Sequence, residues 1–193
     1  MEPPVKYDDV KDCLLTGDVL LFRQSPTLFG RLIRWYSQSP YSHAGIVLRI
    51  KVNGHDRVAV LESLEPWGVR IFPLERYLAQ EKSCGAIIDW YQVVDPAVNR
   101  EKIAAYALDQ WGKRYSSPWQ FIWSFGRLFT KIRERYELPA NVNPGRYFCS
   151  QLVAAALEHA GYVPEREWAD SADTTPGEVS LFPCLHRRGV LEV

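Results

Sequence analysis

The sequence predicts an α+β fold in one domain. Strand-like segments gather in the first half of the chain and helical segments in the second half, an order typical of α+β domains. The dipeptide Asn53-Gly54 lies between two strand-like runs and is a strong hairpin signal. A length of 193 residues with 47% apolar residues suits a single compact core. We therefore expect residues 1–193 to form one domain, with a central antiparallel sheet or barrel packed against helices.

Apolar runs bounded by turn residues predict five strands in the first half of the chain. Two helices are expected among them. Apolar residues recur at helical spacing from 28 to 36, with an end near Ser39-Pro40, and a short helix is expected from 74 to 79. The expected strands are residues 19–22, 43–50, 57–62, 68–72 and 85–93.

Helices dominate the second half. Asp95-Pro96 is a favourable helix start, because Asp caps the first turn and Pro is tolerated there. A second helical stretch begins near Pro118, and an Ala-rich helix begins at Cys149. Gly161 ends that helix, and mostly irregular chain is expected after it. The helix behind Pro96 has one apolar face, made of Ile103, Ala104, Ala107, Leu108 and Trp111.

Charge and cysteine usage exclude several classes of protein. Lys plus Arg equals Asp plus Glu at 23 each, which argues against a nucleic-acid partner held by bulk charge. The four cysteines are widely spaced and form no Cys-x-x-Cys pair, so no metal or other cofactor is expected. The chain has no run long enough to span a bilayer and no signal peptide, which predicts a cytoplasmic protein as written. The alternative is a protein whose signal peptide has been trimmed from this sequence.

Cys149 is the first candidate for chemistry. A thiol at a helix start lies near unpaired backbone N–H groups and the positive end of the helix dipole, which favour the thiolate. The thiolate is the form of cysteine that attacks carbonyl groups. The cysteine shares one helical stripe with apolar residues that point to the core: Leu152, Val153, Ala156 and Ala160. The alternative interpretation is a buried, inert cysteine in an Ala-rich helix.

His43 is the candidate base, because it is the one histidine that opens an apolar strand. A structural role at the strand end is the alternative. His55 lies in the hairpin turn, His159 lies in the last turn of the cysteine helix, and His186 lies in a basic segment near the C-terminus.

The hairpin register predicts a carboxylate partner for His43. If Asn53-Gly54 forms a two-residue turn, Gly45 faces Glu62, and His43 and Glu62 project from the same face of the sheet. As diagonal neighbours they lie about 6–8 Å apart at the backbone, a gap that their side chains can bridge. A one-residue bulge would place them on opposite faces. Asp56 and Glu65 are competing carboxylates nearby.

Five motifs occur in an order that resembles a known family. They are Gly-Asp-Val-Leu-Leu-Phe (17–22), Ser-His-Ala-Gly-Ile-Val (42–47), Val-Leu-Glu-Ser (60–63), Gly-Lys-Arg-Tyr (112–115) and Tyr-Phe-Cys-Ser-Gln-Leu-Val (147–153). The set resembles the circularly permuted branch of the NlpC-type papain-like superfamily, the YiiX/YaeF-like proteins, over most of residues 14 to 162. In the unpermuted relatives the cysteine helix precedes the histidine strand.

The resemblance implies roles for four residues. Cys149 would be the nucleophile, His43 the base and Glu62 the residue that orients His43. Tyr115 would place a hydroxyl beside the oxyanion site, whereas its alternative is a half-buried loop tyrosine. Relatives often have Asp after this tyrosine, and this chain has Ser116-Ser117 instead. Lecithin:retinol acyltransferase is a further permuted relative with a different cysteine motif, so its lipid chemistry does not carry over directly.

The resemblance implies a cysteine hydrolase that cleaves an amide bond of a small peptide-like substrate through a thioester acyl-enzyme. Two alternatives stay open: a lipid-directed thioesterase or acyltransferase, and a catalytically silent papain-like binding protein. No feature predicts an oligomeric state.

An aromatic segment at about residues 116–145 bears on that choice. Trp119, Ile122, Trp123, Gly126 and Phe129 share one helical face. The segment is either a helix packed on the sheet or a hydrophobic lid beside the active site, in contact with a lipid or membrane surface through residues 119–129.

Overall fold

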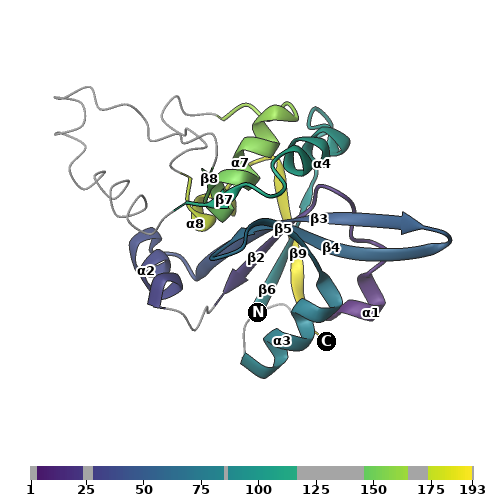
Figure 1. The fold of residues 1–193 in the computed structure, drawn as a ribbon, viewed down its shortest axis with the longest axis horizontal. Coiled ribbons are helices and arrows are strands. Elements are labelled where there is room, and N and C mark those ends of the chain that lie inside the picture. The colour runs from purple at the N-terminus through teal and green to yellow at the C-terminus, as the bar shows by residue number, and fades with distance from the viewer. Residues whose placement is uncertain (1–3, 24–27, 85–86, 117–145, 165–173, 193) are drawn as a thin grey trace.

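The computed structural model describes residues 4–23, 28–84, 87–116, 146–164 and 174–192. A large sheet lies at its centre, and helices cover both faces (Figure 1). The predicted mixed α+β architecture is therefore confirmed. Closure of the sheet into a barrel stays a prediction, and the described strands have β1 and β5 as the two edges.

The main sheet has seven strands in the order β1-β9-β6-β2-β3-β4-β5. Neighbouring strands are antiparallel, except that β1 and β9 are parallel. A second sheet pairs β7 with β8 in parallel. The strands are β1 (Val5–Lys6), β2 (Val19–Arg23), β3 (Tyr41–Val52), β4 (His55–Leu64), β5 (Gly68–Pro73), β6 (Ile87–Val93), β7 (Arg114–Tyr115), β8 (Arg146–Tyr147) and β9 (Leu185–Glu192).

The β3–β4 hairpin has the predicted register. Asn53 and Gly54 have φ values of 47° and 79°, as a turn with two left-handed residues requires. Gly45 pairs with Glu62, and the ladder continues without a bulge to Val52 and His55. Because the register has no slip, His43 and Glu62 belong to the same face of the sheet.

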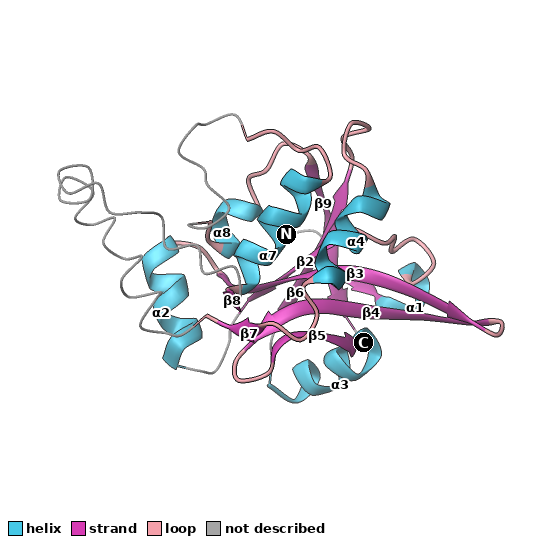
Figure 2. Ribbon diagram, turned by 45° about the horizontal axis from the view of Figure 1, so that its top comes forward, coloured by secondary structure: helices cyan, strands magenta, loops and turns pink. Residues whose placement is uncertain are grey.

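Helices lie on both sides of the sheet (Figure 2), and each face of the sheet carries a hydrophobic core. The first core holds the helix α7 (Cys149–His159) and the helix α4 (Arg100–Asp109) against residues such as Ala44 and Ile46. The second core packs α1 (Tyr7–Val10) and α3 (Leu74–Cys84) against residues such as Val47. The face of β3 that carries His43 is thus buried in protein rather than open to solvent. The remaining described helices are α2 (Leu28–Ser37) and α8 (Pro176–Val179).

Two sequence expectations are wrong. The chain after Gly161 is not mostly irregular, because β9 is a strand of the main sheet. Its buried residues do not share one face, because Leu185 packs in the first core and Leu191 in the second, with a register shift opposite Trp90 and Tyr91 between them. The Arg187 guanidinium contacts buried Asp89 at 2.7 Å, and the basic run therefore hides this strand in the sequence.

The helix expected from Asp95-Pro96 begins instead at Arg100. Asn99 is its N-cap, and the Asn99 side chain accepts a hydrogen bond from Lys102 N at 3.0 Å. Asp95 accepts instead from Ala97 N within a preceding turn. The predicted apolar face is also wrong at two positions: Leu108 is 38% exposed, and Trp111 lies beyond the end of α4 at Asp109 and is 65% exposed.

No helix in the described ranges is long and apolar enough to cross a membrane. The predicted aromatic segment lies outside the described residues apart from Ser116. Ser116 is buried, and its backbone N–H donates to Tyr147 O at 3.1 Å.

Candidate active site

Cys149 is the first residue of α7, as the sequence predicts. Phe148 precedes it in extended backbone, and the Gln151 side chain accepts a hydrogen bond from Phe148 N at 3.0 Å, which fixes the helix start. The stripe that follows, from Leu152 to Ala160, is buried in the first core. Packing of this stripe against β3 therefore aims Cys149 into the protein, where it is 2% exposed.

The Cys149 sulfur lies at the junction of α7 and β3. It accepts hydrogen bonds from the backbone N–H groups of Ala44 and Ser150, and it is hydrogen-bonded to the imidazole of His43. Burial opposes ionisation of this thiol, but the positive charge of His43 and these donors outweigh burial and lower the pKa of Cys149. The thiol is therefore set up to exist as a thiolate.

His43 joins the thiol to a buried carboxylate. Its Nε2 lies 2.6 Å from Oε2 of Glu62, and both residues are buried. This contact leaves Nδ1 as the ring nitrogen available to the Cys149 sulfur. Phe22 packs against the imidazole at 5.1 Å between ring centroids. The diagonal contact between His43 and Glu62 that the hairpin register predicts is present.

Cys149, His43 and Glu62 form a buried row, and each charge in this row stabilises the charge next to it. Burial alone would lower the pKa of His43, but the negative charges of Cys149 and Glu62 raise it to about 10. Burial would raise the pKa of Glu62, but His43 and Arg70 lower it. At neutral pH the structure therefore favours a thiolate, an imidazolium and a carboxylate in sequence.

This ion pair predicts a pH dependence of stability. The folded pKa of His43 exceeds the unfolded value of about 6.5, so its contribution is full below that pH and is lost as pH rises towards about 10. The folded pKa of Cys149 is below the unfolded value of about 8.5, so its contribution is full above that pH and is lost as pH falls. Between about pH 6.5 and 8.5 the two slopes cancel.

We expect the free energy of unfolding of the native protein, minus that of a His43→Asn/Cys149→Ala variant, to be highest and flat between about pH 6.5 and 8.5. Above that range the difference should fall by about 1.4 kcal/mol per pH unit until about pH 10. Urea unfolding followed by circular dichroism at several pH values measures it. A difference that does not change between pH 5 and 10 would contradict the thiolate–imidazolium pair.

Arg70 is part of the site, although sequence reasoning missed it. Its Nε and Nη2 lie 2.9 Å and 2.8 Å from Oε1 of Glu62, the oxygen that His43 does not use. Arg70 is the direct cross-strand partner of Glu62 in the β4–β5 pair. The sequence predicts a strand at residues 68–72 but not how this strand pairs with the strand at 57–62. That pairing register is the signal that would have identified Arg70.

Tyr115 lies beside the start of α7. It pairs with Tyr147 in the β7–β8 sheet, and its ring packs edge-on against Phe148 at 5.6 Å. Hydrogen bonds from Val69 N to Lys113 O and from Gly112 N to Val69 O hold the preceding residues against β5. Burial, followed by the charges of Cys149 and Glu65, raises the pKa of the Tyr115 hydroxyl well above its usual value. The hydroxyl therefore keeps its proton and can act as a donor.

The other candidate carboxylates and histidines lie apart from the row of Cys149, His43 and Glu62. Asp56 pairs with Arg49 near the hairpin turn, and Glu65 is exposed. His55 and His186 are exposed, and the His159 ring packs against Tyr106 at 4.9 Å. Of the four histidines, His43 is the one that the structure brings to Cys149.

Residues 14–129 match the family described as "Permuted papain-like amidase enzyme, YaeF/YiiX, C92 family". The chain belongs to this family. The matched stretch contains His43, Glu62, Arg70 and Tyr115 and ends before Cys149. The resemblance read from the five sequence motifs is thus confirmed, and the family supports a cysteine hydrolase in general.

This member of the permuted papain-like amidases also resembles a solved structure, titled as that of metalloprotein YiiX from Escherichia coli O157:H7. The two share 18% identity with a TM-score of 0.59, and the match covers 90% of this chain and 95% of the other. At this identity the likeness shows the fold alone. No curated protein matches the sequence. Among the residues that the structure describes, no group of three or more His, Cys, Asp or Glu side chains is placed to hold a metal ion.

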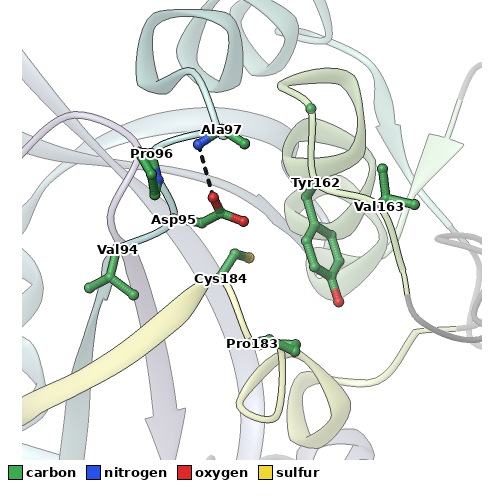
Figure 3. A pocket seen from close by; sticks show the side chains of 9 residues that line it. Val94, Asp95, Pro96, Ala97, Tyr162, Val163, Pro183 and Cys184 are labelled. Atoms are coloured by element: carbon green, nitrogen blue, oxygen red, sulfur yellow. Dashed lines mark hydrogen bonds between the residues drawn. The ribbon is translucent and has the colours of Figure 1, made fainter.

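A second buried cysteine of this family member shows how the surroundings of Cys149 change its thiol. Cys184 lines a cavity of about 490 Å³ with Tyr162, Pro183 and Asp95 (Figure 3). This cavity adjoins the C-terminal end of α7, about 16 Å from the end that carries Cys149. Burial raises the pKa of Cys184 to about 12. The pKa values of two buried thiols thus shift in opposite directions, because Cys149 has an imidazole partner and Cys184 is dominated by burial.

Proposed function

We propose that this protein is a cysteine hydrolase that cleaves an amide bond in a small peptide-like substrate, with Cys149 as the nucleophile. The observation that carries the proposal is the buried row of Cys149, His43 and Glu62 at the start of α7. A nucleophile, a base and a residue that orients the base are the parts that acyl transfer through a covalent intermediate requires. Membership of a permuted papain-like amidase family agrees with this chemistry.

In the proposed acylation step, the Cys149 thiolate attacks the carbonyl carbon of the substrate, and a C–S bond forms while the carbonyl oxygen becomes an oxyanion. The backbone N–H of Cys149 and the Tyr115 hydroxyl donate to that oxyanion. The His43 imidazolium then gives its Nδ1 proton to the amide nitrogen, and the C–N bond breaks. The amine leaves, and a thioester on Cys149 and a neutral imidazole remain.

In the proposed deacylation step, neutral His43 takes a proton from a water molecule as the water oxygen attacks the thioester carbon. The C–S bond breaks, the acyl group leaves as a carboxylic acid, and the Cys149 thiolate and His43 imidazolium are restored. Glu62 holds the imidazole in one orientation through Nε2 in both steps and stabilises its positive charge.

Trapping of the acyl-enzyme tests the proposed function. The protein is mixed with a panel of small peptide amides, simple esters and fatty-acyl thioesters, quenched in acid during turnover, and analysed by peptide mass spectrometry. The proposal expects a mass increase equal to the acyl fragment of a peptide amide on the peptide that contains Cys149, and none in Cys149→Ala.

Two other results would replace the proposal. An adduct from fatty-acyl substrates alone would favour a lipid-directed thioesterase or acyltransferase. Failure of Cys149 to react selectively with an alkylating agent near neutral pH, together with no adduct from any substrate, would favour a papain-like binding protein.

Tyr115→Phe tests the proposed oxyanion donor, because it keeps the ring against Phe148 and deletes only the hydroxyl. Loss of one such donor is expected to lower kcat by about 10²–10³-fold. The melting temperature should barely change, because a net hydrogen bond contributes about 0.5–1.5 kcal/mol. The two measurements are single-turnover acylation and thermal unfolding. An acylation rate within a few-fold of the native protein would leave Tyr115 as a packing residue.

A further inference from the structure

Glu62 lies between two cations, and each of its oxygens has its own partner. Oε2 contacts His43, whereas Oε1 accepts a hydrogen bond from Nε of Arg70 and lies 2.8 Å from its Nη2. The Glu62 side chain is fully buried, whereas that of Arg70 is 25% exposed. A buried carboxylate keeps its charge only if it is paired and hydrogen-bonded, and here both conditions are met on both oxygens.

The structure also fixes the Arg70 guanidinium. Arg70 stands directly opposite Glu62 across the β4–β5 pair, so the shortest path for its side chain leads to the carboxylate. The guanidinium lies over the ring of Phe72 at 4.8 Å, two residues along the same strand. A planar group held by a ring on one side and a carboxylate at its edge has few other orientations.

We propose that Arg70 is a positioning residue of this protein, which holds the Glu62 carboxylate in the orientation that binds Nε2 of His43 and balances its charge. The catalytic consequence rests on the proposed function, whereas the effect on the Cys149–His43 pair does not. Arg70 touches neither the thiol nor the substrate in this role. It acts through Glu62.

The charges explain why the buried row of Cys149, His43 and Glu62 needs Arg70 as its fourth member. Thiolate, imidazolium, carboxylate and guanidinium alternate in sign and sum to zero. Without the guanidinium the buried row carries a net negative charge, and a negative surrounding favours protonation of every group within it. The thiolate of Cys149 then forms only at higher pH. Oε1 also loses its contacts with Nε and Nη2 of Arg70, so nothing on that side holds the carboxylate towards His43.

The test compares Arg70→Gln with Arg57→Gln. Arg57 is a matched control, because it lies on β4 and pairs with exposed Glu75 at 3.2 Å rather than with Glu62. The rate of Cys149 alkylation by iodoacetamide is measured from pH 4 to 10, and His43 is titrated by NMR. We expect the alkylation profile of Arg70→Gln to move to higher pH and that of Arg57→Gln to match the native protein. With a substrate, kcat should fall about tenfold in Arg70→Gln with KM within twofold, because Arg70 supports the reacting groups only through Glu62.

Two further variants separate positioning from folding. Arg70→Lys should restore much of the alkylation profile, because it returns the charge, but not the full kcat, because one ammonium does not replace two directed donors. In a Glu62→Gln background, Arg70→Gln should have no further effect on kcat or on the alkylation profile. An unchanged profile in Arg70→Gln, or an undiminished effect in that background, would overturn the proposal.

The measurements distinguish failure of the proposed hydrolase function from failure of the proposed role of Arg70. If the native protein turns over no amide, the alkylation and NMR titrations still decide the role of Arg70. If the native protein is active and Arg70→Gln is unchanged in all readouts, only the role of Arg70 is lost.

Discussion

Replacement of Cys149 by alanine is expected to lower kcat by about 10⁶-fold, because loss of the nucleophile of a covalent mechanism removes nearly all turnover. The residue is small and buried, and it begins a stripe that already contains Ala156 and Ala160, so alanine fits its place. We expect the variant to fold and to bind substrate. Turnover of the amide found by acyl-enzyme trapping measures the effect.

Cys184→Ala is the matched control for that variant. Cys184 is also buried in the first core, but burial raises the pKa of its thiol, and it has no role in the proposed reaction. We expect its kcat to equal that of the native protein even if its stability falls. Equal losses of activity in the two variants would mean that packing rather than chemistry explains the loss in Cys149→Ala.

Glu62→Gln is expected to lower kcat by about 10⁴-fold, the loss measured when the carboxylate of a serine protease triad becomes an amide. The amide is nearly isosteric, but it carries no charge to stabilise the His43 imidazolium. It also offers its NH₂ group to either His43 or Arg70, both of which donate hydrogen bonds to the carboxylate. The pH dependence of Cys149 alkylation should change together with kcat.

Glu75→Gln serves as the control, because Glu75 also pairs with an arginine, at 3.2 Å, but at an exposed position on α3. Thermal unfolding of both variants tests whether the fold survives. Activity of Glu62→Gln within tenfold of the native protein would move the orienting role to another residue.

The hairpin explains why much of the site could be predicted from sequence. A two-residue turn at Asn53-Gly54 fixes every pairing in β3 and β4, so one local signal places His43 and Glu62 on the same face. The helix start at Cys149 is equally local, since it depends on the change from extended chain to an Ala-rich stripe. Short-range patterns of this kind predict the register and the helix start correctly here, because no tertiary contact overrides them.

The parts that the sequence did not reveal depend on strand pairings that no turn signal in the sequence fixes. Arg70 reaches Glu62 through the register of β4 with β5, which follows a turn with no hairpin signal of its own. The strand β9 joins the sheet beside β6, and the salt bridge of Arg187 with Asp89 places charge at an inward position. Charged residues that are buried by a partner far away in the chain look like surface residues in the sequence.

One measurement tests the central claim most directly: the sites that iodoacetamide labels at pH 6.5, read by peptide mass spectrometry after a short reaction. The account predicts fast labelling at Cys149, because His43 and backbone donors hold it as a thiolate, and no labelling at Cys184, whose thiol stays protonated. His43→Asn should abolish the fast reaction. Labelling of Cys149 no faster than that of exposed Cys13, or rising only above about pH 8.5 as for an ordinary thiol, would contradict the account.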